Sequence, residues 1–164
     1  MLPDPLHPAV VHLPVALAML MPLLAILALL SIRRGLLPVR TWAGIVLLQA
    51  LLVGSAWLSL ETGEEQEERV ERVVAERHIE HHADAAQRFL ALAVVGLVVC
   101  GAGLLPARPG EIARLGGAVL SFAVLAAGGY AGRAGGELVY KYGAANAYVD
   151  AQAAGAGGES ADDD

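Results

Sequence analysis

The chain has 164 residues and a net charge of −6; 56% of its residues are hydrophobic and only 17% are charged. A soluble domain of this length needs more charge to cover its surface, so the composition excludes an ordinary soluble protein. The negative net charge and the lack of a basic patch in the sequence also argue against a nucleic-acid partner.

Four apolar stretches follow one another along the chain, at residues 9–31, 41–60, 89–105 and 115–132. Each approaches the ~20 residues that cross about 30 Å of hydrocarbon as a helix. None of them alternates with the period of two that a barrel strand requires. We therefore predict an all-α integral membrane four-helix bundle at residues 1–143 that contacts the lipid bilayer. Residues 144–164 are acidic and of low complexity, which predicts a disordered tail.

The first stretch opens with the sequence LHPAVVHLP, which holds two histidines and two prolines. It is too long for a signal peptide and no basic segment precedes it, so we expect it to be a retained helix. Pro8 suits the first turn, which places His7 just before the helix and His12 about one turn inside it. An imidazole at membrane depth costs free energy unless it is paired or ligated, so His12 is a candidate ligand. The alternative is a neutral His12 that is hydrogen-bonded to a residue such as Glu61.

Basic residues in the short connections predict the orientation of the bundle. The first and third connections hold Arg33, Arg34, Arg40, Arg108 and Arg114. The second, from residue 61 to 88, has nine acidic residues against four arginines. We predict a multi-pass protein of the bacterial inner (cytoplasmic) membrane with the first and third connections in the cytoplasm and both termini in the periplasm. All five histidines then lie on the periplasmic side, while Arg133 and Lys141 weaken the charge asymmetry without reversing it.

The acidic connection has the composition of a helix, with no glycine or proline after Gly63. Val70, Val74, His78 and His82 recur at a spacing of four, and His81 flanks them. We therefore predict an amphipathic helix over residues 64–82 that lies on the outer membrane face with this stripe turned inward. The pair His78 and His82 has the spacing that lets two imidazoles approach one ligand. The alternative is that these histidines simply sit at the membrane interface.

The remaining helices carry small residues along one face, which predicts close helix packing. The residues concerned are Gly96, Cys100 and Gly103 in the third helix and Gly117, Ser121, Gly128 and Gly132 in the fourth. A slot for a flat macrocycle is the alternative. Gln49, near the middle of the second helix, is expected to hydrogen-bond a neighbouring helix.

Four motifs resemble those of the bacterial membrane proteins called domain of unknown function 2231. They are HPAVVHLPVAL at the start, ETG after the second helix, EHH before the third and GGELVYKYG after the fourth, in matching order from His7 to about Gly143. Leu13 replaces a phenylalanine that is usual in the family, and Tyr142 replaces a frequent histidine. The resemblance implies an architecture like that of small membrane cytochromes and an association with redox proteins. It also implies one outward-facing site formed by His7, His12 and one of His81 or His82, with Glu61.

These observations support three hypotheses of function. The first is an electron-transfer protein that binds haem b, with His12 and His82 as the preferred axial pair and His78 beside them. The second is a zinc or copper site. Its candidate ligands are His7, His12, Glu61, His78, His81 and His82.

The third hypothesis is a structural or assembly subunit of a membrane complex without a cofactor. The sequence has no CxxCH motif for covalent haem, no Ser/His/Asp arrangement, no phosphate loop and no HExxH motif, so we expect a binding protein rather than an enzyme. Periplasmic redox proteins are the expected partners, and homo-oligomers remain open.

Overall fold

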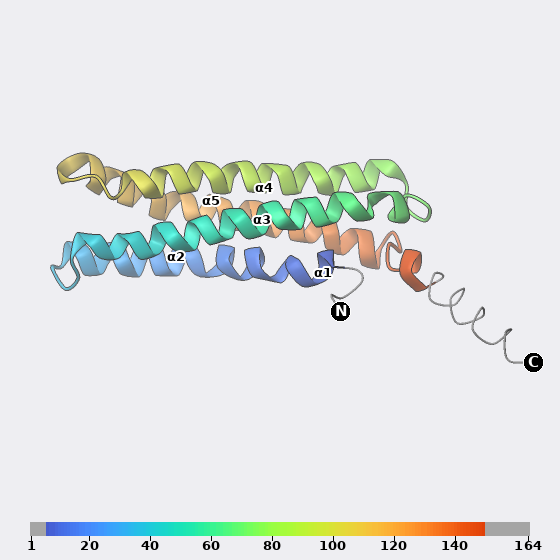
Figure 1. Ribbon diagram of the computed structural model, residues 1–164, viewed down its shortest axis with the longest axis horizontal. Helices are drawn as coiled ribbons and strands as arrows, with labels where there is room; N and C mark the ends of the chain where they lie inside the picture. The colour runs from blue at the N-terminus through green and yellow to red at the C-terminus, as the bar shows by residue number, and fades with distance from the viewer. Residues whose placement is uncertain (1–5, 150–164) are drawn as a thin grey trace, which may run out of the picture.

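The computed structural model describes residues 6–149 and is all-helical over that range. Its elements are α1 (His7–Val10), α2 (His12–Arg33), a short 3-10 turn (Val39–Thr41), α3 (Trp42–Val70), α4 (Glu76–Ala102) and α5 (Ala107–Tyr140). The four long helices lie side by side as an elongated bundle, in which α2 and α4 each pack against both α3 and α5 (Figure 1). Four helical segments are long and apolar enough to cross a membrane, which confirms the predicted four-helix bundle.

The two ends of the bundle differ in charge. The connections at residues 34–41 and 103–106 lie together at one end, which we call the arginine end (Figure 1). The turn at residues 71–75 lies at the opposite end, together with α1 and the last described residues. We call this opposite end the acidic end, because the acidic segment from Glu61 to Asp84 is located there.

The helices extend well beyond the apolar stretches, and this corrects the prediction of a separate surface helix over residues 64–82. Helix α3 continues to Val70, residues 71–75 form a turn, and α4 begins at Glu76. With 29 and 27 residues, these helices are roughly 40 Å long at 1.5 Å per residue, about 10 Å longer than the hydrocarbon core. The acidic segment is therefore the projecting tip of a helical hairpin.

A small apolar cluster explains why the chain reverses at this point. Val74 is buried together with Ile79, Leu138 and Ala144, and Val70 packs against them. A turn after Val70 lets this stripe bury itself within the bundle, so it does not need the membrane surface as a partner. The inward position that we predicted for Val70 and Val74 is confirmed.

The core between the helices consists largely of small and aliphatic side chains, as the face of small residues predicted, except that Gly132 of this face is exposed. Gln49 lies in the middle of this core and donates a hydrogen bond from Nε2 to the backbone oxygen of Ala93, at 2.9 Å, as predicted. Gly96 gives it room, because a Cβ atom there would lie 2.8 Å from Nε2 of Gln49. The buried apolar cluster comprises Leu17, Ala18, Met21, Ala25, Leu29, Trp42, Ile45, Leu52, Ala56, Ala85, Phe89, Ala93, Cys100, Ala118, Val124 and Ala131.

The sequence predicted that Arg114 lies in the third connection. In the structure, Arg114 instead lies inside α5, where it is buried. Its Nη1 donates a hydrogen bond of 2.6 Å to the backbone oxygen of Gly103, just after the end of α4. A guanidinium is favourable there because the last carbonyl groups of a helix lack intrahelical partners and carry partial negative charge. Arg114 therefore fixes the α4–α5 connection.

The predicted tail begins inside the described part of the chain. Ala144 is buried in the apolar cluster at the acidic end, and the hydroxyl of Tyr148 donates a hydrogen bond of 2.7 Å to Oε1 of Gln66. The chain thus stays in contact with α3 as far as Tyr148. Residues 150–164 of the expected tail lie outside the described residues.

Candidate histidine site

His7 lies at the start of α1 and is held against α3. Its Nδ1 donates a hydrogen bond of 2.8 Å to the backbone oxygen of Ser59, and Oγ1 of Thr62 lies 3.3 Å from the same nitrogen. A Cβ atom on Gly63 would approach Cε1 of His7 to 3.2 Å, so this glycine lets the ring lie close to the backbone of α3. With the proton on Nδ1, a neutral imidazole keeps a free lone pair on Nε2.

His82, on α4, brings a second imidazole to the same place. The ring centres of His7 and His82 are 6.3 Å apart and the ring planes are inclined by 80°. Nδ1 of His82 is buried without a hydrogen-bond partner among the described residues. A Cβ atom on Gly135 of α5 would lie 2.9 Å from Cε1 of His82, so this ring also rests against a glycine. A buried polar atom without a partner is costly, which makes this nitrogen a candidate metal or cofactor ligand.

His12 is not part of this arrangement. It is exposed in the first turn of α2, and Glu61 is exposed on α3. The structure therefore brings His82 together with His7, and the expected pairing of His82 with His12 is not formed.

His78 and His81 face a different feature, a polar pocket between α4 and α5. The ring of His78 stacks on Tyr142, with 3.7 Å between the ring centres, and Nε2 of His81 shares a hydrogen bond of 2.9 Å with the hydroxyl of Tyr130. The six candidate ligands thus separate into a half-buried pair, two pocket residues and two exposed residues. Across residues 6–149, no three His, Cys, Asp or Glu side chains are grouped closely enough to hold a metal ion.

The sequence placed His7 and His82 in one candidate site but favoured His12 as the partner of His82, although a signal for His7 was present. Pro14, Leu17 and Met21 are buried on the inward face of α2, and His7 lies seven residues before Pro14. Two helical turns before Pro14, the same inward face contains His7, whereas His12 lies on a different face. The roles of Gly63 and Gly135 could not be found in this way, because both depend on contacts between helices.

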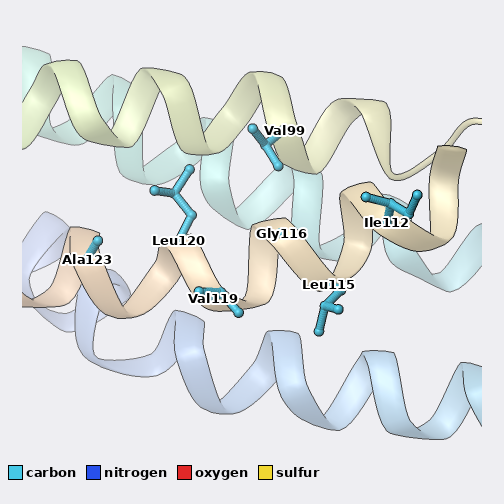
Figure 2. Close-up of a pocket in the computed structure, with 7 residues that line it drawn as sticks. All are labelled: Val99, Ile112, Leu115, Gly116, Val119, Leu120 and Ala123. Carbon is cyan, nitrogen blue, oxygen red and sulfur yellow. The ribbon is translucent and has the colours of Figure 1, made fainter.

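An open groove, of about 550 Å³, lies on the surface of the half of the bundle nearer the arginine end (Figure 2). Its lining residues come from α4 and α5 and are Val99, Ile112, Leu115, Gly116, Val119, Leu120 and Ala123. None of them can ionise or ligate a metal, and such apolar surface is ordinary in contact with lipid. The candidate chemistry therefore lies at the acidic end.

Comparison with known proteins gives one match. A family model described as "Predicted membrane protein (DUF2231)" matches residues 3–148, which is nearly the whole chain. No curated protein and no solved structure matches the chain.

Proposed function

The chain belongs to the DUF2231 family of predicted membrane proteins, and from this premise we propose that it is a bacterial inner-membrane protein whose His7–His82 pair binds a copper ion for electron transfer. One observation carries the proposal: the buried Nδ1 of His82 has no partner among the described residues, and a second imidazole lies beside its ring. Natural proteins rarely leave such an atom unsatisfied, so it normally binds a protein group, an ordered water or an ion.

The separation of the two rings fits a bridging ion. Metal–nitrogen bonds to histidine are about 2.0 Å long, so two imidazoles on opposite sides of one ion have ring centres roughly 6 Å apart. The observed separation is 6.3 Å. The hydrogen bond from Nδ1 of His7 to Ser59 also supports this role, because a fixed tautomer is how proteins orient a metal-binding imidazole.

Copper suits this donor set better than zinc or haem b. Zinc sites normally have four ligands, or three with an open position, and the described residues offer no such group here. A porphyrin would need open space around both rings, whereas both rings rest against glycines of neighbouring helices. Two imidazoles suffice for Cu(I), which accepts a linear pair of nitrogen ligands, and in the Cu(II) state water or a group of the redox partner would have to complete the coordination.

The place of the pair near one end of the bundle supports a role in electron transfer. A copper ion bound there would exchange one electron at a time between its two oxidation states. The acidic end projects beyond the membrane, so a periplasmic redox protein could approach this site from the aqueous side. The protein's own contribution is to orient both imidazoles and to keep His82 out of water.

A purely structural role is the second candidate, and the hydrogen bond from His7 to Ser59 favours it. This bond joins α1 to α3, so it could serve only to fix the start of the chain on the bundle. In the structural role, a buried water or the backbone oxygen of Ala131 would have to satisfy the nitrogen of His82.

Copper titration of the purified, metal-free protein in detergent separates these candidates. We expect one copper ion per chain, and we expect His7→Ala and His82→Ala each to weaken binding by more than about 100-fold, because each removes a direct ligand. His12→Ala is the matched control, since it removes an exposed imidazole outside the pair. An equal loss of copper affinity in all three variants, or no stoichiometric copper binding to wild type, would contradict the copper site and favour the structural role.

The absorption spectrum and metal content of the gently purified protein distinguish the cofactors. Haem b ligated by two histidines gives a sharp Soret band and resolved α and β bands after reduction, whereas zinc gives a metal count without colour. We expect copper in the metal analysis and no Soret band.

We also propose that the acidic end faces the periplasm, on the basis of the arginines in the opposite connections. Single cysteines at Arg34 and Glu68, both exposed, can be introduced after replacing the buried Cys100 by alanine. A membrane-impermeant thiol reagent applied to intact cells lacking the outer membrane should label position 68 and spare position 34. The reverse pattern would overturn the orientation.

A further inference from the structure

The polar pocket between α4 and α5 at the acidic end is distinct from the His7–His82 pair. It has a volume of about 250 Å³ and is lined by His78, His81, Ala134, Glu137 and Tyr142. Pockets for drug-sized ligands usually measure roughly 300–1,000 Å³, so this one suits a small polar group. Neither His7 nor His82 lines it.

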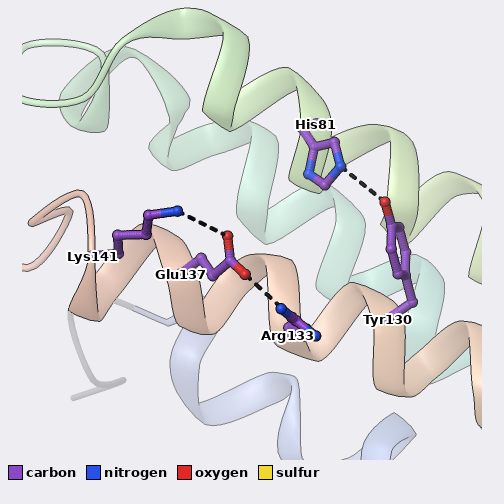
Figure 3. A network of polar contacts seen from close by, with 5 residues as sticks. All are labelled: His81, Tyr130, Arg133, Glu137 and Lys141. Atoms are coloured by element: carbon purple, nitrogen blue, oxygen red, sulfur yellow. Dashed lines mark hydrogen bonds and ion pairs between the residues drawn. The ribbon is translucent and has the colours of Figure 1, made fainter.

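Two basic residues next to this pocket flank the carboxylate of its lining. Glu137 is the acidic residue in the lining, and its carboxylate lies between two cations (Figure 3). Nε of Arg133 is 3.2 Å from Oε1 of Glu137, and Nζ of Lys141 is 3.8 Å from Oε2. The cluster of these three residues therefore carries a net charge of about +1 before any imidazole is protonated.

The pocket also offers hydrogen-bond donors. His81 and Tyr130 share a hydrogen bond, which fixes the ring of His81 beside the Arg133–Glu137 pair (Figure 3). The ring of His78 is held by stacking on Tyr142, and no hydrogen bond to its nitrogens occurs within residues 6–149. A metal cation is a poor occupant, because Arg133 and Lys141 already neutralise the carboxylate of Glu137 in the lining.

The position of the two cations along α5 indicates where the ligand would come from. The last long apolar stretch ends near residue 132; Arg133 follows it directly, and Lys141 lies about 12 Å further along the helix axis, just after the end of α5. This is the level of lipid headgroups, where basic residues attract anionic lipids. These same two residues depart from the charge asymmetry of the chain, and an anionic ligand would account for that departure.

We infer that this pocket binds a phosphate group, carried by an anionic lipid headgroup or as free phosphate. Arg133 and Lys141 would contact the phosphate oxygens at the rim, while His78 and His81 donate from the lining. This inference does not depend on copper binding, because the two sites use different histidines.

Lipid binding can be measured by native mass spectrometry of the full chain after exchange into nanodiscs of phosphatidylglycerol or of phosphatidylcholine. We expect one retained phosphatidylglycerol per chain and none for phosphatidylcholine. Arg133→Gln and Lys141→Gln should each weaken retention about fivefold, the loss expected for one basic residue near an anionic surface. Arg88→Gln is the matched control, because Arg88 is an exposed helical arginine paired with Asp84 in the same i,i+4 manner.

Inorganic phosphate added in a neutral detergent tests the second source. A saturable rise in melting temperature that is lost in Arg133→Gln but kept in Arg88→Gln would assign the pocket to free phosphate. Equal retention of both lipids together with no effect of inorganic phosphate would overturn the inference. So would an equal loss in Arg88→Gln and Arg133→Gln.

Discussion

Gly135→Val should release copper even though both histidines remain. A Cβ atom at position 135 would lie 2.9 Å from Cε1 of His82, and the branched side chain of valine extends this clash to the rest of the ring. The ring must then move away from the position in which it faces His7. We expect the copper affinity to fall by at least about tenfold, because bound ligands must stay close to their productive geometry.

Gly132→Val is the matched control for this experiment. It lies on the same helix, it is exposed, and a Cβ atom there would meet nothing within 4 Å. Gly135→Ala should give an intermediate loss, since it adds only the first atom of the clash. If Gly135→Val binds copper as tightly as Gly132→Val while both keep their helical content, His82 is not a ligand.

His82→Leu should stabilise the metal-free protein and destabilise the copper-bound protein relative to wild type. Leucine fills a similar volume and removes the unpartnered nitrogen, whose burial costs about 1–3 kcal/mol. Copper reverses the order, because a ligand at 1,000 times its dissociation constant stabilises the wild-type fold by about 4.1 kcal/mol and the variant gains nothing. The test is to measure the melting temperatures of wild type and His82→Leu, each with and without copper.

The direction in which His82→Leu shifts the melting temperature of the metal-free protein distinguishes a metal ligand from a structural residue. A purely structural His82 would contribute favourable contacts, so its replacement by leucine would then lower the melting temperature of the metal-free protein. Leu138→Ala provides a reference for ordinary loss of packing, because Leu138 is buried at the same end of the bundle.

The sequence was sufficient to predict the bundle because the relevant signals are local. Each apolar stretch identifies one helix, and Gln49 could be expected to bond a neighbouring helix because a polar group in a span needs a partner. The periodicity around Val70 and Val74 likewise identified their inward face. The continuation of α3 to Val70 was missed because composition indicates a helix but not which surface that helix will pack against.

The candidate site was only partly predictable, because two properties of a residue in a membrane helix are independent. One is its depth in the membrane, and the other is the face of the helix on which its side chain lies. His12 was favoured for its depth in the first helix, yet it lies off the face formed by Pro14, Leu17 and Met21 and is exposed. His82 was identified correctly as facing inward, and it is half-buried in the bundle. Its partner follows from the way α1 docks on Ser59 and Thr62, a contact across 52 or more positions that no local pattern encodes.

X-ray absorption at the copper edge tests most directly whether His7 and His82 share one copper ion. The predicted spectrum has nitrogen neighbours at about 2.0 Å with the outer-shell scattering of two imidazoles. This scattering should fall to that of one imidazole in His7→Ala loaded with excess copper, and it should remain at two in His12→Ala. A spectrum dominated by sulfur, or one in which His12→Ala and not His7→Ala removes an imidazole, would contradict the proposed site.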